Sequence, residues 1–185
     1  MKLAVKTITL LIVIVTALNI IDLPVELRFE NTAYNYLVVS VLSIALPASL
    51  LLASLLALEK EAKVVGYIAS FALILPCAFI FTISSNDFRR INDGGSDKSF
   101  EKIAELESNG SKYRLYRTNG GATTSFGLVL RSETPLAVGI NVVKVVFDKY
   151  KAYEGSLILL DDKTIQVRIE PYDRGHQAEI VTLTI

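Results

Sequence analysis

Three long apolar runs, each with a centre free of ionisable residues, constrain this chain more than any other feature. They extend over about residues 7–23, 34–58 and 64–84. A helix needs about 20 predominantly apolar residues, at roughly 1.5 Å per residue, to cross a hydrocarbon core about 30 Å thick. The sequence therefore predicts a membrane protein in which residues 1–85 form three transmembrane helices.

The first run has an alternative interpretation, a signal peptide that is cleaved. Lys2 and Lys6 make a positive start, and Val15-Thr16-Ala17 is a weak match to a small-residue cleavage site. The apolar stretch is longer than the core of most signal peptides, however, and no A-x-A sequence follows it. We therefore expect the first run to be retained as a membrane anchor.

The composition agrees with a membrane protein and excludes several other classes. The chain is 51% hydrophobic, and its mean hydropathy of +0.44 is high for a soluble domain, whose surface is mostly polar. The 19 basic and 19 acidic residues cancel, so nucleic acid is not an expected partner. A single cysteine, Cys77, and a single histidine, His176, exclude an internal disulfide and a site with two imidazoles. We expect no cofactor and no metal.

The basic residues of the short loops indicate an orientation in the membrane. Four lysines fall on one side of the predicted spans: Lys2, Lys6, Lys60 and Lys63. The first loop, residues 22–31, is mainly acidic, whereas Arg89 and Arg90 follow the third span and count against the assignment. Because cytoplasmic loops carry an excess of lysine and arginine, we expect a cytoplasmic N-terminus in a bacterial inner membrane. The C-terminal domain is then periplasmic or extracellular.

Residues 100–185 have the pattern of a small antiparallel β-domain, joined to the membrane part by a linker at 86–99. Ile165, Val167 and Ile169 alternate with polar residues, as expected for a strand with one buried face. Further strands are predicted at 113–117, 125–131, 142–147, 157–160 and 180–185. Turn signals separate them at Asn109-Gly110, Asn119-Gly120-Gly121, Thr134-Pro135, Glu154-Gly155, Asp161-Asp162 and Asp173-Arg174-Gly175. The fold class is therefore α+β, with a sandwich or meander barrel after three transmembrane helices.

Small residues at steps of four form stripes on two of the predicted helices. The second helix carries Ala45, Ser49, Ala53 and Ala57, and the third carries Gly66 and Ser70. Small side chains let two backbones approach closely in lipid, so we expect these stripes to pack the two helices together. The alternative is that one stripe binds a helix of a partner. The absence of charges from the span centres argues against a transporter.

The sequence from Asn119 to Thr124 is the most conspicuous in the β-domain. Asn-Gly between two strands favours a tight hairpin, because both turn positions need positive φ. The alternative is a binding loop of Asn119, Gly120, Gly121, Thr123 and Thr124, in which backbone N–H groups hold an anion or a carboxylate of a partner.

No pattern in the sequence indicates an enzyme. Ser125 and His176 are present, but nothing resembles a nucleophile elbow, and His176 lies in a predicted turn. We therefore expect no catalytic residue.

Between Ser108 and about Ile169 the chain resembles a family of small bacterial membrane-attached β-domains of uncharacterised function. Three elements carry the resemblance: Ser108-Asn109-Gly110-Ser111-Lys112-Tyr113, Asn119-Gly120-Gly121-Ala122-Thr123-Thr124 and Leu160-Asp161-Asp162-Lys163-Thr164-Ile165. The chain departs from the family in lacking the proline of the first element and in having three spans where one anchor is expected. The resemblance implies a β-domain on a membrane anchor and no activity.

These observations together favour a non-catalytic recognition or accessory module that binds another membrane or envelope protein. An immunity-type protein, which shields the membrane against a toxin, is one concrete version. A β-domain that binds a small ligand or acts as a sensor is the alternative, and a homo-oligomer stays open.

Overall fold

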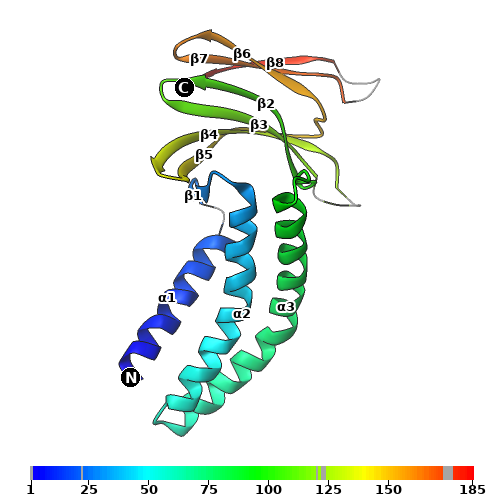
Figure 1. Ribbon diagram of the computed structural model, residues 1–185. Helices are drawn as coiled ribbons and strands as arrows, with labels where there is room; N and C mark the ends of the chain where they lie inside the picture. Colours follow the sequence, from blue (N-terminus) through cyan, green and yellow to red (C-terminus); the bar gives the residue numbers. More distant parts are fainter. Residues whose placement is uncertain (1, 22, 120, 122–123, 173–176) are drawn as a thin grey trace. The chain divides into compact units, whose positions relative to one another are not determined.

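The computed structural model describes residues 2–21, 23–119, 121, 124–172 and 177–185 (Figure 1). The chain forms two compact units. The first is helical and contains the residues up to Leu23 together with Asn31–Gly95; the second is built of strands and contains Pro24–Glu30 together with Ser96–Ile185. The chain therefore enters the second unit twice, once briefly between the first two helices and once for its whole C-terminal half.

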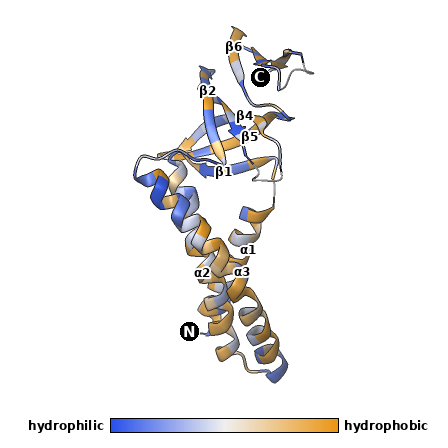
Figure 2. Cartoon of the chain, turned by 90° about the vertical axis from the view of Figure 1, so that its right-hand side faces the viewer, coloured by the Kyte–Doolittle hydropathy of each residue, from blue (hydrophilic) through white to orange (hydrophobic). Residues whose placement is uncertain are grey.

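The helical unit consists of α1 (Lys2–Ile20), α2 (Thr32–Leu56) and α3 (Lys60–Asn92). All three are long and apolar enough to cross a membrane. Figure 2 shows hydrophobic residues along the helices and hydrophilic ones at the α2–α3 turn and at the end of α3. Asn31 directly precedes α2 and caps it, because its side chain accepts a hydrogen bond from the Ala33 amide.

The third helix is longer than its apolar run. At roughly 1.5 Å per residue its 33 residues extend over about 50 Å, well beyond a hydrocarbon core of about 30 Å. Residues 86–92, expected to be linker, are therefore helical, and that expectation was wrong for this part. Asp87 and Arg90, one helical turn apart, form an ion pair at 2.8 Å that stabilises this polar end of the helix.

The second unit contains two antiparallel sheets. The strands are β1 (Val25–Phe29), β2 (Phe100–Ser108), β3 (Ser111–Thr118), β4 (Gly127–Ala137), β5 (Ile140–Tyr150), β6 (Gly155–Asp161), β7 (Thr164–Ile169) and β8 (Glu179–Thr184). Five strands form one sheet in the order β1-β5-β4-β3-β2, and three form the other in the order β6-β7-β8. The prediction of an antiparallel β-region after three long helices is confirmed.

Two strands were not predicted, and one of them lies outside the expected β-domain. β1 belongs to the loop between α1 and α2 but pairs with β5, with Leu27 opposite Val142. Its alternation of Val25, Leu27 and Phe29 with two charged residues is a strand pattern, although only five residues long. β2 was also missed. It pairs with β3 through a two-residue Asn109-Gly110 turn, which the sequence did predict, and both turn residues have positive φ (52° and 74°).

One core cluster draws on both sheets. Its members are Tyr113, Leu115, Leu128, Leu130, Ala152, Ile165, Val167 and Ile169. Gly155 begins β6 where the backbone passes close to this core, since a Cβ there would lie 3.0 Å from a Leu128 methyl group. Burying one aliphatic side chain fully is worth about 1.5–3 kcal/mol, so the fully buried members stabilise the unit strongly.

The turn predicted at Thr134-Pro135 differs from the structure. Thr134 and Pro135 lie inside β4, where the register shifts next to the proline, and the chain reverses instead near Gly139, whose φ is 73°. A proline is tolerated at such an irregularity because it has no ladder hydrogen bond to lose. The turn expected at Asp173-Arg174-Gly175 and His176 lie outside the described residues.

Candidate functional site

The small-residue stripes lie on two different helix contacts. Gly66 of α3 packs against Ser54 of α2 so closely that a Cβ on Gly66 would lie 1.9 Å from the serine hydroxyl oxygen. The Ser70 hydroxyl donates a 2.8 Å hydrogen bond to the carbonyl of Pro47. The carbonyl of Ser49, by contrast, accepts a hydrogen bond from Thr9 of α1.

The α2–α3 contact therefore includes Ser54 and Pro47, which lie outside the stripe predicted on α2. A buried hydrogen bond of 2.8 Å between the hydroxyls of Ser40 and Ser84 continues this contact. Ala45 is half-buried, and Ala53 and Ala57 line a hollow to which α1 also contributes. The hydroxyl hydrogen bonds matter because lipid provides no competing water.

The described part of the Asn119–Thr124 loop bonds to itself. Asn119 Oδ1 accepts a 3.0 Å hydrogen bond from the Gly121 amide, and the Thr124 hydroxyl donates to the Gly121 carbonyl. The Gly121 N–H group therefore already donates a hydrogen bond within the loop, so it is not available to bind an anion. Gly120 and Thr123 lie outside the described residues. Because β3 ends at Thr118 and β4 begins at Gly127, the connection is longer than the tight hairpin expected.

The loop ends beside an open pocket of about 360 Å³. Three segments supply its lining: the residue before β4, the connection before β6, and the residues after β7. The lining residues are Phe126, Tyr153, Glu154, Glu170, Pro171 and Tyr172. We call this the aromatic–acidic pocket.

Backbone hydrogen bonds hold these three segments together. The Ala152 amide donates to the Phe126 carbonyl at 3.2 Å, and the Glu170 amide donates to the Glu154 carbonyl at 3.0 Å. The second bond continues the β6–β7 ladder, in which Gly155 lies opposite Ile169. The pocket is therefore built on strand ends, which fix side chains more rigidly than a free loop does.

The rings in the pocket already attract a cation. The Arg117 guanidinium lies 4.2 Å from the centre of the Tyr153 ring, and the edge-to-face pair of Phe126 and Tyr153 has its ring centres 4.8 Å apart. Such a geometry is attractive because the ring face carries partial negative charge. Arg117 therefore already occupies one face of the Tyr153 ring.

Among the residues that the structure describes, the charges around the pocket leave an excess of one negative charge. Arg117 pairs with Glu101 at 2.5 Å, and Arg168 lies 3.3 Å from Glu170. Within the described residues, Glu154 takes part in no ion pair. Three carboxylates thus face two guanidinium groups, and the pocket favours a positively charged group.

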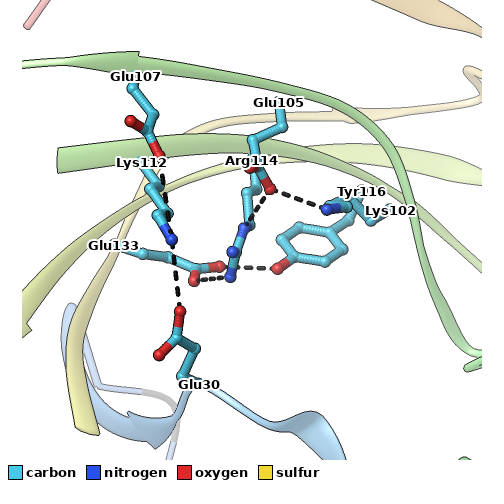
Figure 3. A network of polar contacts seen from close by, with 8 residues as sticks. All are labelled: Glu30, Lys102, Glu105, Glu107, Lys112, Arg114, Tyr116 and Glu133. Carbon is cyan, nitrogen blue, oxygen red and sulfur yellow. Dashed lines mark hydrogen bonds and ion pairs between the residues drawn. The ribbon is translucent and has the colours of Figure 1, made fainter. Parts of the chain in front are cut away.

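A second cluster, on β2, β3 and β4, is an ion-pair network (Figure 3). Arg114 lies between two carboxylates, with Nη1 2.6 Å from Glu133 and Nε 2.7 Å from Glu105. The Tyr116 hydroxyl donates to Glu133 at 2.7 Å. The side chains of Arg114 and Glu133 are only 13% and 7% exposed, so this pair is largely removed from water.

The pKa values in the network follow from these contacts. Hydrogen bonds from Lys102 and Arg114 lower the pKa of Glu105 to about 2. Burial, and then the hydrogen bond to Glu133, raises the pKa of Tyr116. Lys112 extends the network to Glu30, 3.3 Å away, and so ties the end of the first loop to β3. Because its charges are paired with one another, we interpret the network as structural.

Sequence reasoning did not single out the aromatic–acidic pocket. Its glutamates and tyrosines lie in two separate segments, Tyr153-Glu154 and Glu170-Pro171-Tyr172. The signal was available in principle, because a hairpin that reverses near Asp162 brings residues 154 and 170 opposite each other. Across the described ranges, no group of three or more histidine, cysteine, aspartate or glutamate residues is arranged to hold a metal ion.

Comparison with protein families, characterised proteins and solved structures finds no significant match to this chain. The resemblance to membrane-attached β-domains therefore stays a hypothesis, and any conclusion about function depends on the geometry of the chain itself.

Proposed function

We propose that this protein is a non-catalytic, membrane-anchored recognition module whose β-domain binds a basic side chain of another envelope protein. The aromatic–acidic pocket carries the proposal. It combines Phe126, Tyr153 and Tyr172 with two glutamates and leaves one negative charge unbalanced. Aromatic faces together with carboxylates are the surroundings that lysine and arginine side chains prefer.

The shape of the pocket favours a protein partner over a small molecule. Tyr153, Glu154, Glu170 and Pro171 are exposed, so the pocket is a hollow in the surface. A small-molecule site buries about 70–90% of its ligand, whereas a side chain in a hollow is covered by the rest of its own protein. Tyrosine and arginine contacts of this kind often dominate the energy of a protein interface.

A small cationic ligand is the second candidate. The volume of about 360 Å³ lies within the range of roughly 300–1,000 Å³ that ligand sites occupy. This version makes the β-domain a sensor on a membrane anchor. Titration of the purified protein with an alkylammonium ion tests it: saturable changes in the NMR signals of Tyr153 and Tyr172 without any protein partner would favour the sensor.

We further propose that the helices span a bacterial inner membrane, with the N-terminus in the cytoplasm and the β-domain outside. Two observations support this arrangement. Lys2, Lys6, Lys60 and Lys63 lie at one end of the predicted spans. The pairing of β1 with β5 needs the first loop and the C-terminal strands on one side, as two crossings by α2 and α3 provide.

The finer description of the β-domain is a small sandwich, supported by a core that draws on both sheets. An immunity-type role is a specific case of the recognition module, in which the bound protein is a toxin directed at the membrane.

Photo-crosslinking in cells tests the proposed recognition directly. A photoreactive phenylalanine analogue replaces Tyr172, which lines the pocket. We expect an adduct of defined mass with an envelope protein. The double change Glu154→Lys and Glu170→Lys should abolish it, because a positive pocket repels a basic side chain.

The control is Glu107→Lys, which reverses the charge of one exposed carboxylate outside the pocket. It should leave the adduct intact. An adduct that survives the double change, or that the control removes equally, would contradict recognition by this pocket.

A further inference from the structure

The helical unit contains a hollow of about 710 Å³ to which all three helices contribute. It lies at the end of the unit where α1 begins and α2 turns into α3. Its walls are mainly apolar, with Leu50 and Ala53 on α2, Ala57 directly after α2 and Ala69 on α3. The side chains of Lys2 and Lys6 also line it, from the first turns of α1.

The hollow exists because Ala53 and Ala57 have short side chains and α1, which faces them, lies too far away to fill the space. Figure 1 shows α1 diverging from α2 toward its N-terminus. Thr9 still contacts the Ser49 carbonyl, but the turns of α1 before it face the two alanines at positions 53 and 57. Alanine side chains are too short to fill the space, so an apolar groove is left.

A groove of this kind within a bilayer is filled by lipid. From Leu50 to Ala57 the wall extends over eight residues, or roughly 10 Å along the helix axis, which is long enough for the part of an acyl chain nearest the headgroup. Burial of methylene groups is favourable when the alternative is water, but in a membrane this contribution does not distinguish one lipid from another. The choice between lipids therefore depends on the headgroup.

The charges at this end of the unit favour an anionic headgroup. Lys60 and Lys63, next to the hollow in the α2–α3 turn, add to the two lysines of α1, while the acidic residues there are Glu59, which also lines the hollow, and Glu61. Four positive and two negative charges leave an excess of two positive charges. Basic pockets between membrane helices bind the phosphates of anionic lipids by this attraction.

We propose that this groove is a binding site for one anionic phospholipid, with an acyl chain against Ala53 and Ala57 and the phosphate at Lys2 and Lys6. The site belongs to the helical unit and is independent of the aromatic–acidic pocket. Bound lipid would fill the space between α1 and the other two helices and so hold the first helix in place.

Native mass spectrometry of the full chain in detergent measures the affinity for each lipid. The probes are phosphatidylglycerol and phosphatidylcholine with identical acyl chains, titrated separately. We expect phosphatidylglycerol to bind more tightly. A lysine near an anionic headgroup contributes about fivefold to affinity, so Lys2→Gln with Lys6→Gln should weaken phosphatidylglycerol binding roughly 30-fold and phosphatidylcholine binding little.

Two further variants separate the headgroup from the groove. Ala57→Phe fills the apolar space and should weaken binding of both lipids. Arg89→Gln removes a positive charge at the opposite end of α3 and should change neither affinity. Equal affinity of the unchanged protein for the two lipids, or an unchanged affinity in the double lysine variant, would overturn the proposal. The lysine positions are exposed, so these substitutions test the site even where Ala57→Phe disturbs folding.

Discussion

The change Glu133→Gln should destabilise the β-domain far more than its size suggests. The carboxylate is almost completely buried and binds both Arg114 Nη1, at 2.6 Å, and the Tyr116 hydroxyl, at 2.7 Å. Glutamine keeps the shape and one acceptor but removes the charge opposite a guanidinium that is only 13% exposed. Arg114 then keeps Glu105 alone as its ionic partner.

The magnitude follows from the cost of leaving a buried charge partly unpaired. Breaking a buried ion pair costs about 3–5 kcal/mol, and the remaining contact to Glu105 places this case near the lower end. A loss of about 3 kcal/mol corresponds to a factor of roughly 150 in the unfolding equilibrium. Glu107→Gln is the matched control, because that side chain is 69% exposed and 3.9 Å from Lys112. It should cost at most about 1 kcal/mol.

Amide hydrogen exchange of the full chain in detergent reads out the β-domain separately from the helices. Protection of β3 and β4 should fall about 150-fold in Glu133→Gln, while protection of α2 and α3 stays unchanged. A fall of less than threefold, or the same fall in Glu107→Gln, would refute the view that this buried pair holds the sheet together.

Three other predictions concern the rest of the chain. The pKa of Glu105 is lowered on folding to about 2 from an ordinary value of 4.5, so its contribution to stability is present above about pH 4.5 and is lost as the pH falls toward 2. Thermal melts from pH 6 to pH 2 should show this loss and show less of it in Glu105→Gln; equal slopes would refute it. Gly66→Leu should lower the melting temperature of the helices, since overpacking costs about 1–3 kcal/mol and a Cβ there already meets a serine hydroxyl, whereas Ala72→Leu on an exposed face should not. Cysteines at Leu27 and Val142 should form a disulfide in the oxidised full chain, because the two positions are direct partners between β1 and β5, and failure to do so would speak against that pairing.

The coarse architecture could be predicted from the sequence because hydrophobicity alone determines it. A helix such as α2, 25 residues of nearly continuous apolar sequence, has few alternatives in any solvent. The buried face of β7 was equally clear, since Ile165, Val167 and Ile169 alternate strictly and are buried in the structure. Local patterns of this kind need no information from distant parts of the chain.

Two of the missed features, β1 and the side of α2 that meets α3, depend on contacts between segments that are distant in the sequence. β1 has a strand pattern, but its partner β5 lies more than a hundred residues away. A strand of five residues is not stable without a partner, so its own sequence does not suffice to predict it. The side of α2 that meets α3 could not be read from steps of four, because Ser54 and Pro47 contact α3 whereas the Ser49 carbonyl accepts a hydrogen bond from α1. Helix rotation in lipid depends on packing, and small residues occur on more than one face.

The candidate site was missed for the same reason. Tyr153 and Tyr172 belong to no recognisable sequence motif and lie in two separate connecting segments. The β6–β7 ladder brings them into one pocket. In the loop that the sequence did predict as a binding site, Asn119–Thr124, the described polar groups form hydrogen bonds with one another. A pattern of glycine and threonine predicts a local turn conformation. Binding, by contrast, depends on which side chains the tertiary structure brings close together.

The central claim is that three helices display the aromatic–acidic pocket outside the cytoplasm, and cysteine labelling in intact spheroplasts tests it most directly. The native Cys77 is buried, and it is first replaced by serine. A membrane-impermeant maleimide should then label a Glu154→Cys variant in intact spheroplasts and should label a Glu61→Cys variant, at the start of α3, only after lysis. Labelling of Glu61→Cys in intact spheroplasts, with Glu154→Cys protected until lysis, would contradict the account and turn the search toward cytoplasmic partners.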